Sequence, residues 1–323
     1  MNRKARTGEG KETETLKASD GSVACFFHTE KIPAFQWPEE TDKGENMSEK
    51  FTLYGFNNLT KSLSFNIYDV CYAKSQREQK DYIAYIDQQY NSERLTKLLV
   101  DVTEMIGASV LNISSQDYEP QGSSVTILIA DESKVPMGDT TIAMGDAAIA
   151  PGDAAMPMGD TVLAHLDKSH ITVHTYPEYH PDTYLATFRV DIDVATCGEI
   201  TPLSTLDYLI GSFDSDIITM DYRVRGFTRD VAGQKLFMDH RMTSIQDFID
   251  GATLRRYDAV DINVYEANLF HTKMLIKEID LQNYLFNSDV YELAPKLRLE
   301  IMGNLRREMI EIFSGRNIYS REQ

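Results

Sequence analysis

Apolar residues recur at three- and four-residue steps in two stretches of the chain, the spacing of a helix that buries one face. These stretches lie at 76–106 and 302–313, and a glycine closes each of them. Glycine is a common helix end because it adopts left-handed backbone angles without a steric penalty. Pro202 favours a third helix over 202–213, since proline is tolerated in a first helical turn.

Strict alternation of apolar and polar residues is typical of a strand with one buried and one solvated face. The alternation is clearest over 187–194. Other strands are predicted at 51–56, 109–113, 124–130, 216–225, 260–265 and 271–276, and one more begins near Ser169. Such strands, mixed with amphipathic helices, favour the α+β class, an α/β sandwich in which helices pack on one face of a mixed, largely antiparallel sheet.

Two segments stand apart from this pattern. Residues 1–46 are polar and lack periodicity, so we expect a disordered extension. Gly-Asp recurs every seven residues within 136–160, and because both are poor helix formers this is not a coiled coil. We interpret this repeat as a surface insert, with metal binding through its aspartates as a less favoured alternative. The remainder, 47–323, is expected to form a single domain.

Composition narrows the classes of function. The 323 residues carry a net charge of −18, which argues against nucleic-acid binding because such proteins usually present a basic face. No apolar run approaches the roughly 20 residues that a membrane span needs. Three widely spaced cysteines argue against a disulfide framework or a paired-cysteine zinc site, and they favour a cytoplasmic location.

Candidate chemistry concentrates around Ser169 and the histidines that flank it, with Cys197 further along the chain. A serine near histidines fits a hydrolase, but no Gly-x-Ser-x-Gly motif surrounds Ser169. His170 and His174 would share one face of a strand and could bind a metal, although structural histidines are commoner. Cys197 fits a nucleophile or proton donor, and equally a small buried apolar residue. The residues alone leave these alternatives open.

Several ordered motifs together resemble the bacterial S-adenosylmethionine decarboxylase proenzymes. Residues 168–178, Lys-Ser-His-Ile-Thr-Val-His-Thr-Tyr-Pro-Glu, resemble the self-cleavage motif of that family, and Thr-Cys-Gly at 196–198 resembles its second motif. The segment at 118–124 (Tyr-Glu-Pro-Gln-Gly-Ser-Ser) is similar to an upstream segment of that family, and residues 54–65 resemble the N-terminal segment of its longer, proteobacterial-type branch. The resemblance runs over residues 50–318.

The resemblance implies an enzyme that makes a pyruvoyl cofactor from its own chain. The Ser169 hydroxyl would attack the Lys168 carbonyl, and elimination from the resulting ester would release a β chain (1–168) and leave dehydroalanine at the start of an α chain (169–323). Water would then convert the dehydroalanine to the pyruvoyl group with loss of ammonia. His174 matches the base that accepts the proton during this elimination. The pyruvoyl carbonyl would form a Schiff base with S-adenosylmethionine and accept electrons as CO₂ leaves, yielding the aminopropyl donor of spermidine synthesis.

The resemblance also implies roles in substrate conversion. Cys197 matches the residue that returns a proton to the substrate carbon, and a thiol with an unperturbed pKa of about 8.5 suits this task. Tyr118 matches an aromatic position that could stack on adenine. Ser124 and Glu178 match active-site positions whose roles are less defined, such as positioning and contact with the ribose hydroxyls.

A metal and an assembly are implied as well. The same branch is associated with Mg²⁺, and Asp191 and Asp193 share a strand face, but an ordinary solvated face is the commoner reason for such a pair. No metal residues are therefore assigned. The αβ units are expected to associate, four α and four β chains being one candidate number, and to borrow active-site residues from one another.

The spacing of the two processing residues sets a geometric condition. In a continuous strand, Ser169 and His174 would face opposite sides and lie roughly 16 Å apart. We therefore expect a bend near Ser169, or a surface-exposed cleavage loop that folds back, to bring them together.

Two other functions fit the same residues. A pyruvoyl-dependent decarboxylase of arginine or ornithine would use the same processing and protonation chemistry, so only the substrate pocket would distinguish it. A non-enzymatic paralogue that serves as a partner subunit is the third hypothesis. The presence of Ser169, His174 and Cys197 argues against it, because a non-enzymatic copy would not need all three reactive side chains.

Overall fold

The structure is a computed structural model, and it describes most of the chain. The described residues are 50–55, 57–131, 169–180, 184–213 and 215–318. The predicted extension 1–46, the predicted insert 136–160 and Lys168 lie outside them.

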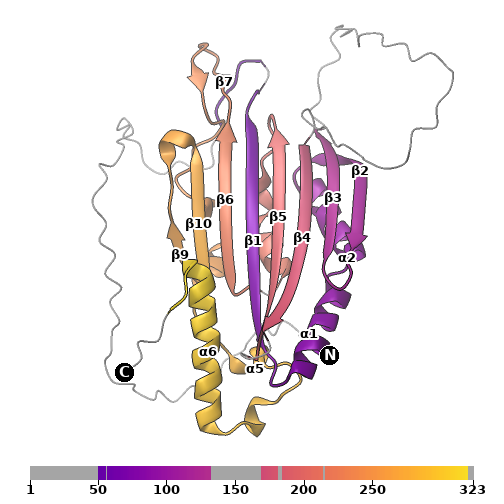
Figure 1. Ribbon diagram of the computed structural model, residues 1–323. Coiled ribbons are helices and arrows are strands. Elements are labelled where there is room, and N and C mark those ends of the chain that lie inside the picture. Colours follow the sequence, from indigo (N-terminus) through magenta and orange to yellow (C-terminus); the bar gives the residue numbers. More distant parts are fainter. Residues whose placement is uncertain (1–49, 56, 132–168, 181–183, 214, 319–323) are drawn as a thin grey trace, which may run out of the picture. The chain divides into compact units, whose positions relative to one another are not determined.

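Within these residues, eight strands form one sheet in which every neighbouring pair is antiparallel (Figure 1). From edge to edge the strands are β2 (Ala108–Asp117), β3 (Ser123–Asp131), β4 (Ser169–His180), β5 (Leu185–Cys197), β1 (Thr60–Tyr72), β6 (Ile217–Arg225), β10 (Leu269–Ile276) and β9 (Tyr257–Asp261). Two short strands, β7 (Thr228–Arg229) and β8 (Lys235–Leu236), pair separately. The first strand in sequence thus lies in the middle of the sheet, between β5 and β6.

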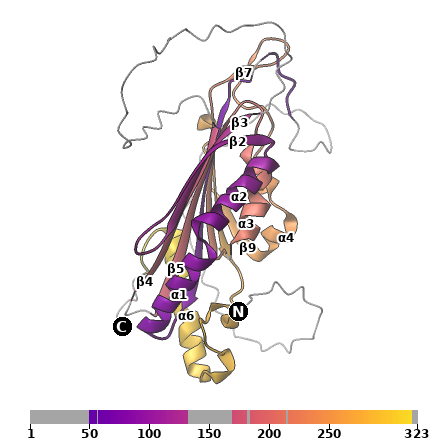
Figure 2. The same cartoon turned by 90° about the vertical axis from the view of Figure 1, so that its right-hand side faces the viewer.

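The main core lies between one face of the sheet and a layer of helices. The helices of this layer include α1 (Gln76–Gln89), α2 (Ser92–Met105) and α3 (Leu206–Ser212), and the other described α-helices are α4 (Gly251–Arg256), α5 (Leu281–Tyr284) and α6 (Pro295–Ser314). Alternate residues of β1, such as Leu63 and Phe65, pack with apolar residues of α1, α2 and α3. Figure 2 shows α2 and α3 to one side of the sheet, which is seen edge-on.

Helix α6 forms a second, partial layer on the opposite face. Its Leu305 and Met309 pack with Val70 and Ile217, which project from the other side of β1 and β6. In Figure 1 this helix lies in front of the sheet, over the ends of β9 and β10. The predicted α+β class is confirmed. The helices do not all lie on one face, however, because the apolar stripe of α6 is buried by the apolar ends of the central strands.

Most predicted elements are present. The helical pattern at 76–106 is two helices, because the Asn91 side chain accepts a hydrogen bond from the Arg94 amide and begins α2 there. The predicted helix at 202–213 begins as a 3₁₀ turn and continues as α3, and the predicted 260–265 strand is shifted to β9.

Two features of the N-terminal region differ from the prediction. The predicted strand at 51–56 is wrong, since residues 50–55 make only single bridges, from Lys50 to His240 and from Leu53 to Asp230. The central strand β1 was missed, although its alternating residues 63–67 carry the signal for it.

Candidate active site

Ser169 and Cys197 meet at one end of the sheet. Ser169 is the first described residue of β4 and Cys197 is the last residue of β5, and these antiparallel strands are neighbours. The Ser169 Oγ lies 3.6 Å from the Cys197 Sγ. Ser169 is only 6% exposed, whereas the Cys197 side chain is exposed. A thiol is therefore in contact with the side-chain hydroxyl of Ser169, the residue that the motifs single out.

His174 lies elsewhere, because β4 is continuous over all twelve of its residues. Ser169 shares the buried side of this strand with Ile171 and Val173, while His174 is half-buried on the other side. Five strand residues separate the two by roughly 16 Å. The predicted bend is thus wrong for the described residues: β4 pairs with β3 over Ser169–His174 and with β5 over His170–His180, and a bend between Ser169 and His174 would break both ladders. The chain before Ser169, where the predicted loop would lie, is outside the described residues.

A second group of candidate residues gathers around His174. Ser124 of β3 is directly opposite His174 in the strand register, so the two side chains share a face. The Tyr118 hydroxyl donates to the Ser124 Oγ at 2.8 Å. The ring of Tyr176 stacks near His174, with 6.4 Å between their centroids, and Arg189 lies over Tyr176 at 4.5 Å.

The turn between β2 and β3 holds Tyr118 in place. The Tyr118 amide donates to the Gly122 carbonyl at 2.8 Å, and the Gly122 amide donates to Asp87 of α1 at 2.9 Å. Gly122 has a φ of +95°, and a Cβ there would lie 2.7 Å from the Thr175 carbonyl oxygen. Only glycine therefore allows this turn to lie against β4.

Asp117 joins the same turn to the start of α2. Its carboxylate accepts hydrogen bonds from the amide and hydroxyl of Ser92 at 2.7 and 2.9 Å, and from the Ser123 hydroxyl at 2.7 Å. The pKa of Asp117 is held below its ordinary value, mainly by the Ser123 hydrogen bond and then by Ser92. A carboxylate at a helix N-terminus also interacts favourably with the helix dipole.

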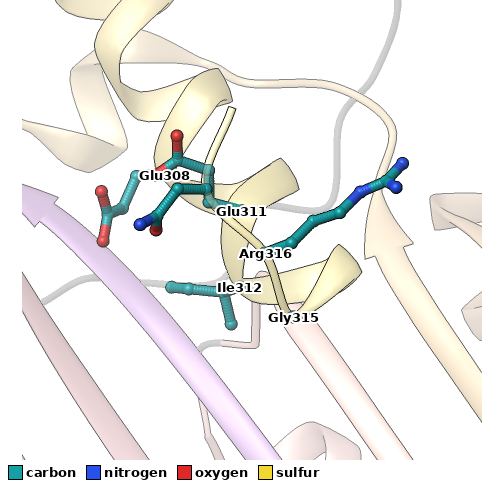
Figure 3. A pocket seen from close by; sticks show the side chains of 6 residues that line it. Glu308, Glu311, Ile312, Gly315 and Arg316 are labelled. Carbon is teal, nitrogen blue, oxygen red and sulfur yellow. The ribbon is translucent and has the colours of Figure 1, made fainter. Parts of the chain in front are cut away.

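Glu178 lies apart from both groups, further along the same face of β4 as His174. It acts electrostatically on Glu308 of α6, whose pKa is raised by burial and then by the nearby charges of Glu311 and Glu178. Glu308 and Glu311 line a pocket of about 360 Å³ at the end of α6 (Figure 3). The described residues therefore do not bring Glu178 to Ser169.

The aspartates considered for a metal have other partners. Asp191 is ion-paired with Arg189, whose Nε lies 2.9 Å from the Asp191 Oδ1, and Asp193 accepts a hydrogen bond from Ser64. Across the part of the chain that the structure describes, no three His, Cys, Asp or Glu residues gather as a metal site. In that same part, no helix is both long enough and apolar enough to cross a membrane.

Sequence reasoning missed three residues behind Cys197: Asn57, Lys61 and Asp239. All three are buried: Asn57 and Lys61 donate to the Gly198 carbonyl, in the turn that follows Cys197, and Asp239 accepts from both of them. The only signal in the sequence is a lysine at an inward position of β1, where an apolar residue is the norm.

Known proteins of one family match this chain. The family model described as S-adenosylmethionine decarboxylase matches residues 152–226. Proteins named S-adenosylmethionine decarboxylase proenzyme from Clostridium beijerinckii and Alkaliphilus oremlandii are 72% identical over 274 residues and 70% identical over 273 residues. One of that name from Hahella chejuensis is 58% identical over 272 residues. Each alignment covers 84% of this chain and 99% of the relative.

These relatives are proenzymes by name, so the class is that of decarboxylases made as precursors. The chain belongs to the S-adenosylmethionine decarboxylase family. The resemblance inferred from the motifs is thereby confirmed.

Proposed function

We propose that this chain cleaves itself between Lys168 and Ser169 and then decarboxylates S-adenosylmethionine with a pyruvoyl group formed at residue 169. The products of cleavage are a β chain (1–168) and an α chain (169–323), and the cut falls within one domain (47–323). The observation that carries the proposal is the 3.6 Å contact between the Ser169 Oγ and the Cys197 Sγ in a chain of this family.

The chain's own residues have distinct tasks. Ser169 supplies the hydroxyl on the β-carbon without which neither the ester nor the elimination is possible. The pyruvoyl carbonyl, once formed, supplies an electron sink for the loss of CO₂. Cys197 acts as a general acid through its thiol and delivers a proton to the substrate carbon at the same end of the sheet.

A second copy of the chain completes this site in the proposal. A base must lie within hydrogen-bond reach of the proton that it accepts, and His174 is roughly 16 Å from Ser169 along its own strand. The regular pairing of β4 on both sides opposes any bend that would close this gap. His174 of one copy therefore serves Ser169 of another, and an assembly of four α and four β chains would contain such pairs.

The neighbours of His174 would enter the shared site with it. Tyr118, held by the turn before β3, presents an aromatic ring for the adenine, and Ser124 lies between Tyr118 and His174 to position the reacting groups. Glu178 would bind the ribose hydroxyls only from a copy placed close to α6. No residue is assigned to Mg²⁺ in this proposal, and no step is assigned to that ion. Sparse cysteines favour a cytoplasmic location.

The test is intact-mass spectrometry of the purified protein followed by a CO₂-release assay. We expect two chains divided at Lys168–Ser169, with the α chain about 17 Da lighter than one that begins with serine, as conversion to a pyruvoyl group requires. S-adenosylmethionine labelled at its carboxyl group should release CO₂, whereas arginine and ornithine should not. A single chain of 36.7 kDa would contradict the proposal, and release from arginine or ornithine alone would favour the other amine substrates.

A further inference from the structure

A buried lysine lies directly behind Cys197. Lys61 is on the inward face of β1 and is 1% exposed. Its Nζ donates to the Gly198 carbonyl at 2.9 Å, to the Ile200 carbonyl at 3.1 Å and to the Asp239 carboxylate at 2.5 Å. An ammonium has three N–H donors, so each of them finds an acceptor here. Two of the three acceptors belong to the turn that follows Cys197.

Asp239 is ion-paired with Lys61, and two further side chains contact its carboxylate. Its Oδ2 accepts a second hydrogen bond from the Asn57 Nδ2 at 3.0 Å, and its Oδ1 lies 2.8 Å from the Nδ1 of His240. Burial opposes ionisation of Asp239, but His240 and Lys61 outweigh it and hold the pKa of Asp239 below its ordinary value. A buried charge is tolerated only when it is paired and hydrogen-bonded, and this network meets both conditions.

The backbone on both sides of Cys197 is fixed by the same segment. Thr60 pairs with Cys197 in the β1–β5 ladder. Gly198, with a φ of +65°, donates its amide to the Leu59 carbonyl at 3.0 Å, and its own carbonyl accepts from both Lys61 and Asn57. The Cys197 side chain is exposed, whereas the amide and the carbonyl of the next residue, Gly198, are both hydrogen-bonded.

We propose that Lys61, anchored by Asp239, is a positioning residue that fixes the turn at Cys197 so that the thiol stays at the reacting carbon. This inference rests on the proposed role of Cys197 as proton donor. Lys61 does not touch the substrate; it acts through the Gly198 and Ile200 carbonyls. Arginine would not replace it, because a planar guanidinium cannot direct donors to three acceptors around a compact ammonium site.

The first test compares steady-state kinetics of Lys61→Met with the wild type, per α chain that carries the pyruvoyl group. We expect kcat to fall about 10- to 100-fold, because a small displacement of a reacting group has this effect, with KM changed less than twofold. The matched control is Tyr284→Phe, which removes a buried 2.6 Å hydrogen bond to Asp216 away from Cys197 and should keep kcat. A wild-type kcat in Lys61→Met would overturn the proposal.

A double-mutant cycle separates positioning from general loss of structure. If Lys61 acts through the thiol, Lys61→Met should cause no further fall in kcat when Cys197 is already alanine. An additive loss in the Cys197→Ala background would show a merely structural role. Should Lys61→Met leave Asp239 too costly to bury, Lys61→Met/Asp239→Asn removes both charges together and takes its place in the same cycle.

Hydrogen exchange tests whether Lys61 fixes the turn after Cys197, and it does so without a measurement of activity. The Gly198 amide is hydrogen-bonded, so it should exchange slowly in the wild type and at least tenfold faster in Lys61→Met, with α6 unchanged. Equal exchange at Gly198 in both proteins would contradict the inference. A wild type that fails to decarboxylate S-adenosylmethionine would instead contradict the proposed function. The exchange rate of the Gly198 amide would still show whether Lys61 fixes this turn.

Discussion

At the scale of single residues, Ser169 combines a nucleophilic hydroxyl with a nearly buried position. Its hydroxyl is the nucleophile that the proposed cleavage needs, and its side chain is nearly buried at the start of β4. Burial keeps bulk water away from the carbonyl that forms there, which protects a reactive electrophile from side reactions. The thiol of Cys197 is the side chain on the described part of the chain that hydrogen-bonds with it.

Replacement of this serine should stop processing. We expect Ser169→Ala to remain a single, inactive chain in intact-mass spectra, because alanine has no heteroatom for the acyl shift. Ser212→Ala, which loses a helical hydroxyl in α3, is the control and should be cleaved like the wild type. Normal self-cleavage in Ser169→Ala would refute the mechanism.

Replacement of His174 should interrupt processing one step later. Without the base, His174→Ala should accumulate the ester, which hydroxylamine splits and water leaves intact on the time scale of the experiment. Denaturing gels with and without hydroxylamine would measure this. Equal cleavage in both lanes would show that the base lies elsewhere.

Replacement of Cys197 should separate processing from turnover. We expect Cys197→Ala to be cleaved yet to lose about 10²- to 10⁴-fold in kcat, the range for removal of a general acid. Mass spectrometry and CO₂ release on one preparation would give both values. Unchanged turnover would remove Cys197 from the catalytic residues.

At the scale of elements, the N-terminus of α2 and the turn before β3 depend on each other. Asp117 accepts hydrogen bonds from Ser92 in the first turn of α2 and from Ser123 at the start of β3. Tyr118 follows Asp117 directly, so the helix and the turn together set the place of the aromatic ring. The pKa of Asp117 is lowered by these contacts, which means that its ionised form stabilises the fold.

Asp117→Asn should therefore weaken the fold at neutral pH by about 0.5 kcal/mol, because Asp117 is exposed and water screens its charge at the helix N-terminus. The contribution is present above the unfolded pKa of about 3.9 and is lost as pH falls through the lower folded value, so the two proteins should converge in acid. Thermal unfolding at several pH values measures this, with Asp81→Asn, on the exposed side of α1, as the control. A constant difference down to pH 2 would contradict the assigned role.

At the scale of the whole molecule, the candidate residues divide into two groups on one sheet. Ser169 and Cys197 meet at a strand end, whereas Tyr118, Ser124 and His174 share an open, polar face. A rigid antiparallel sheet cannot close this gap by itself. The proposed activity therefore depends on association of copies.

Co-expression of two inactive chains tests this dependence. Ser169→Ala supplies His174, and His174→Ala supplies Ser169, so we expect the His174→Ala chain to be partly cleaved in mixed assemblies. The control replaces the first partner with Ser169→Ala/His174→Ala, which offers no base and should give no cleavage. If both residues act within one chain, the mixture would stay uncleaved as well.

The local pattern predicted the elements well where one face is uniformly apolar. Strand β5 and helix α6 follow from alternation and from a three- and four-residue stripe, since burial imposes those periods. The pattern failed for the predicted strand at 51–56, because the apolar residues at 51–55 do not enter the eight-stranded sheet. It also failed to show that α6 covers the second face, because a stripe indicates that a helix is buried but not against which surface.

The sequence by itself determined which reactive groups are present, because the serine, histidine and cysteine stand in motifs that residue type and spacing along the chain are enough to recognise. Tertiary structure decided which of them meet. Strand order puts β1 beside β5 and so brings Lys61 to the carbonyl of Gly198, 137 residues away. The same regular ladder keeps Ser169 and His174 on opposite sides of β4. Such contacts depend on pairing between distant segments, and no local pattern encodes that pairing.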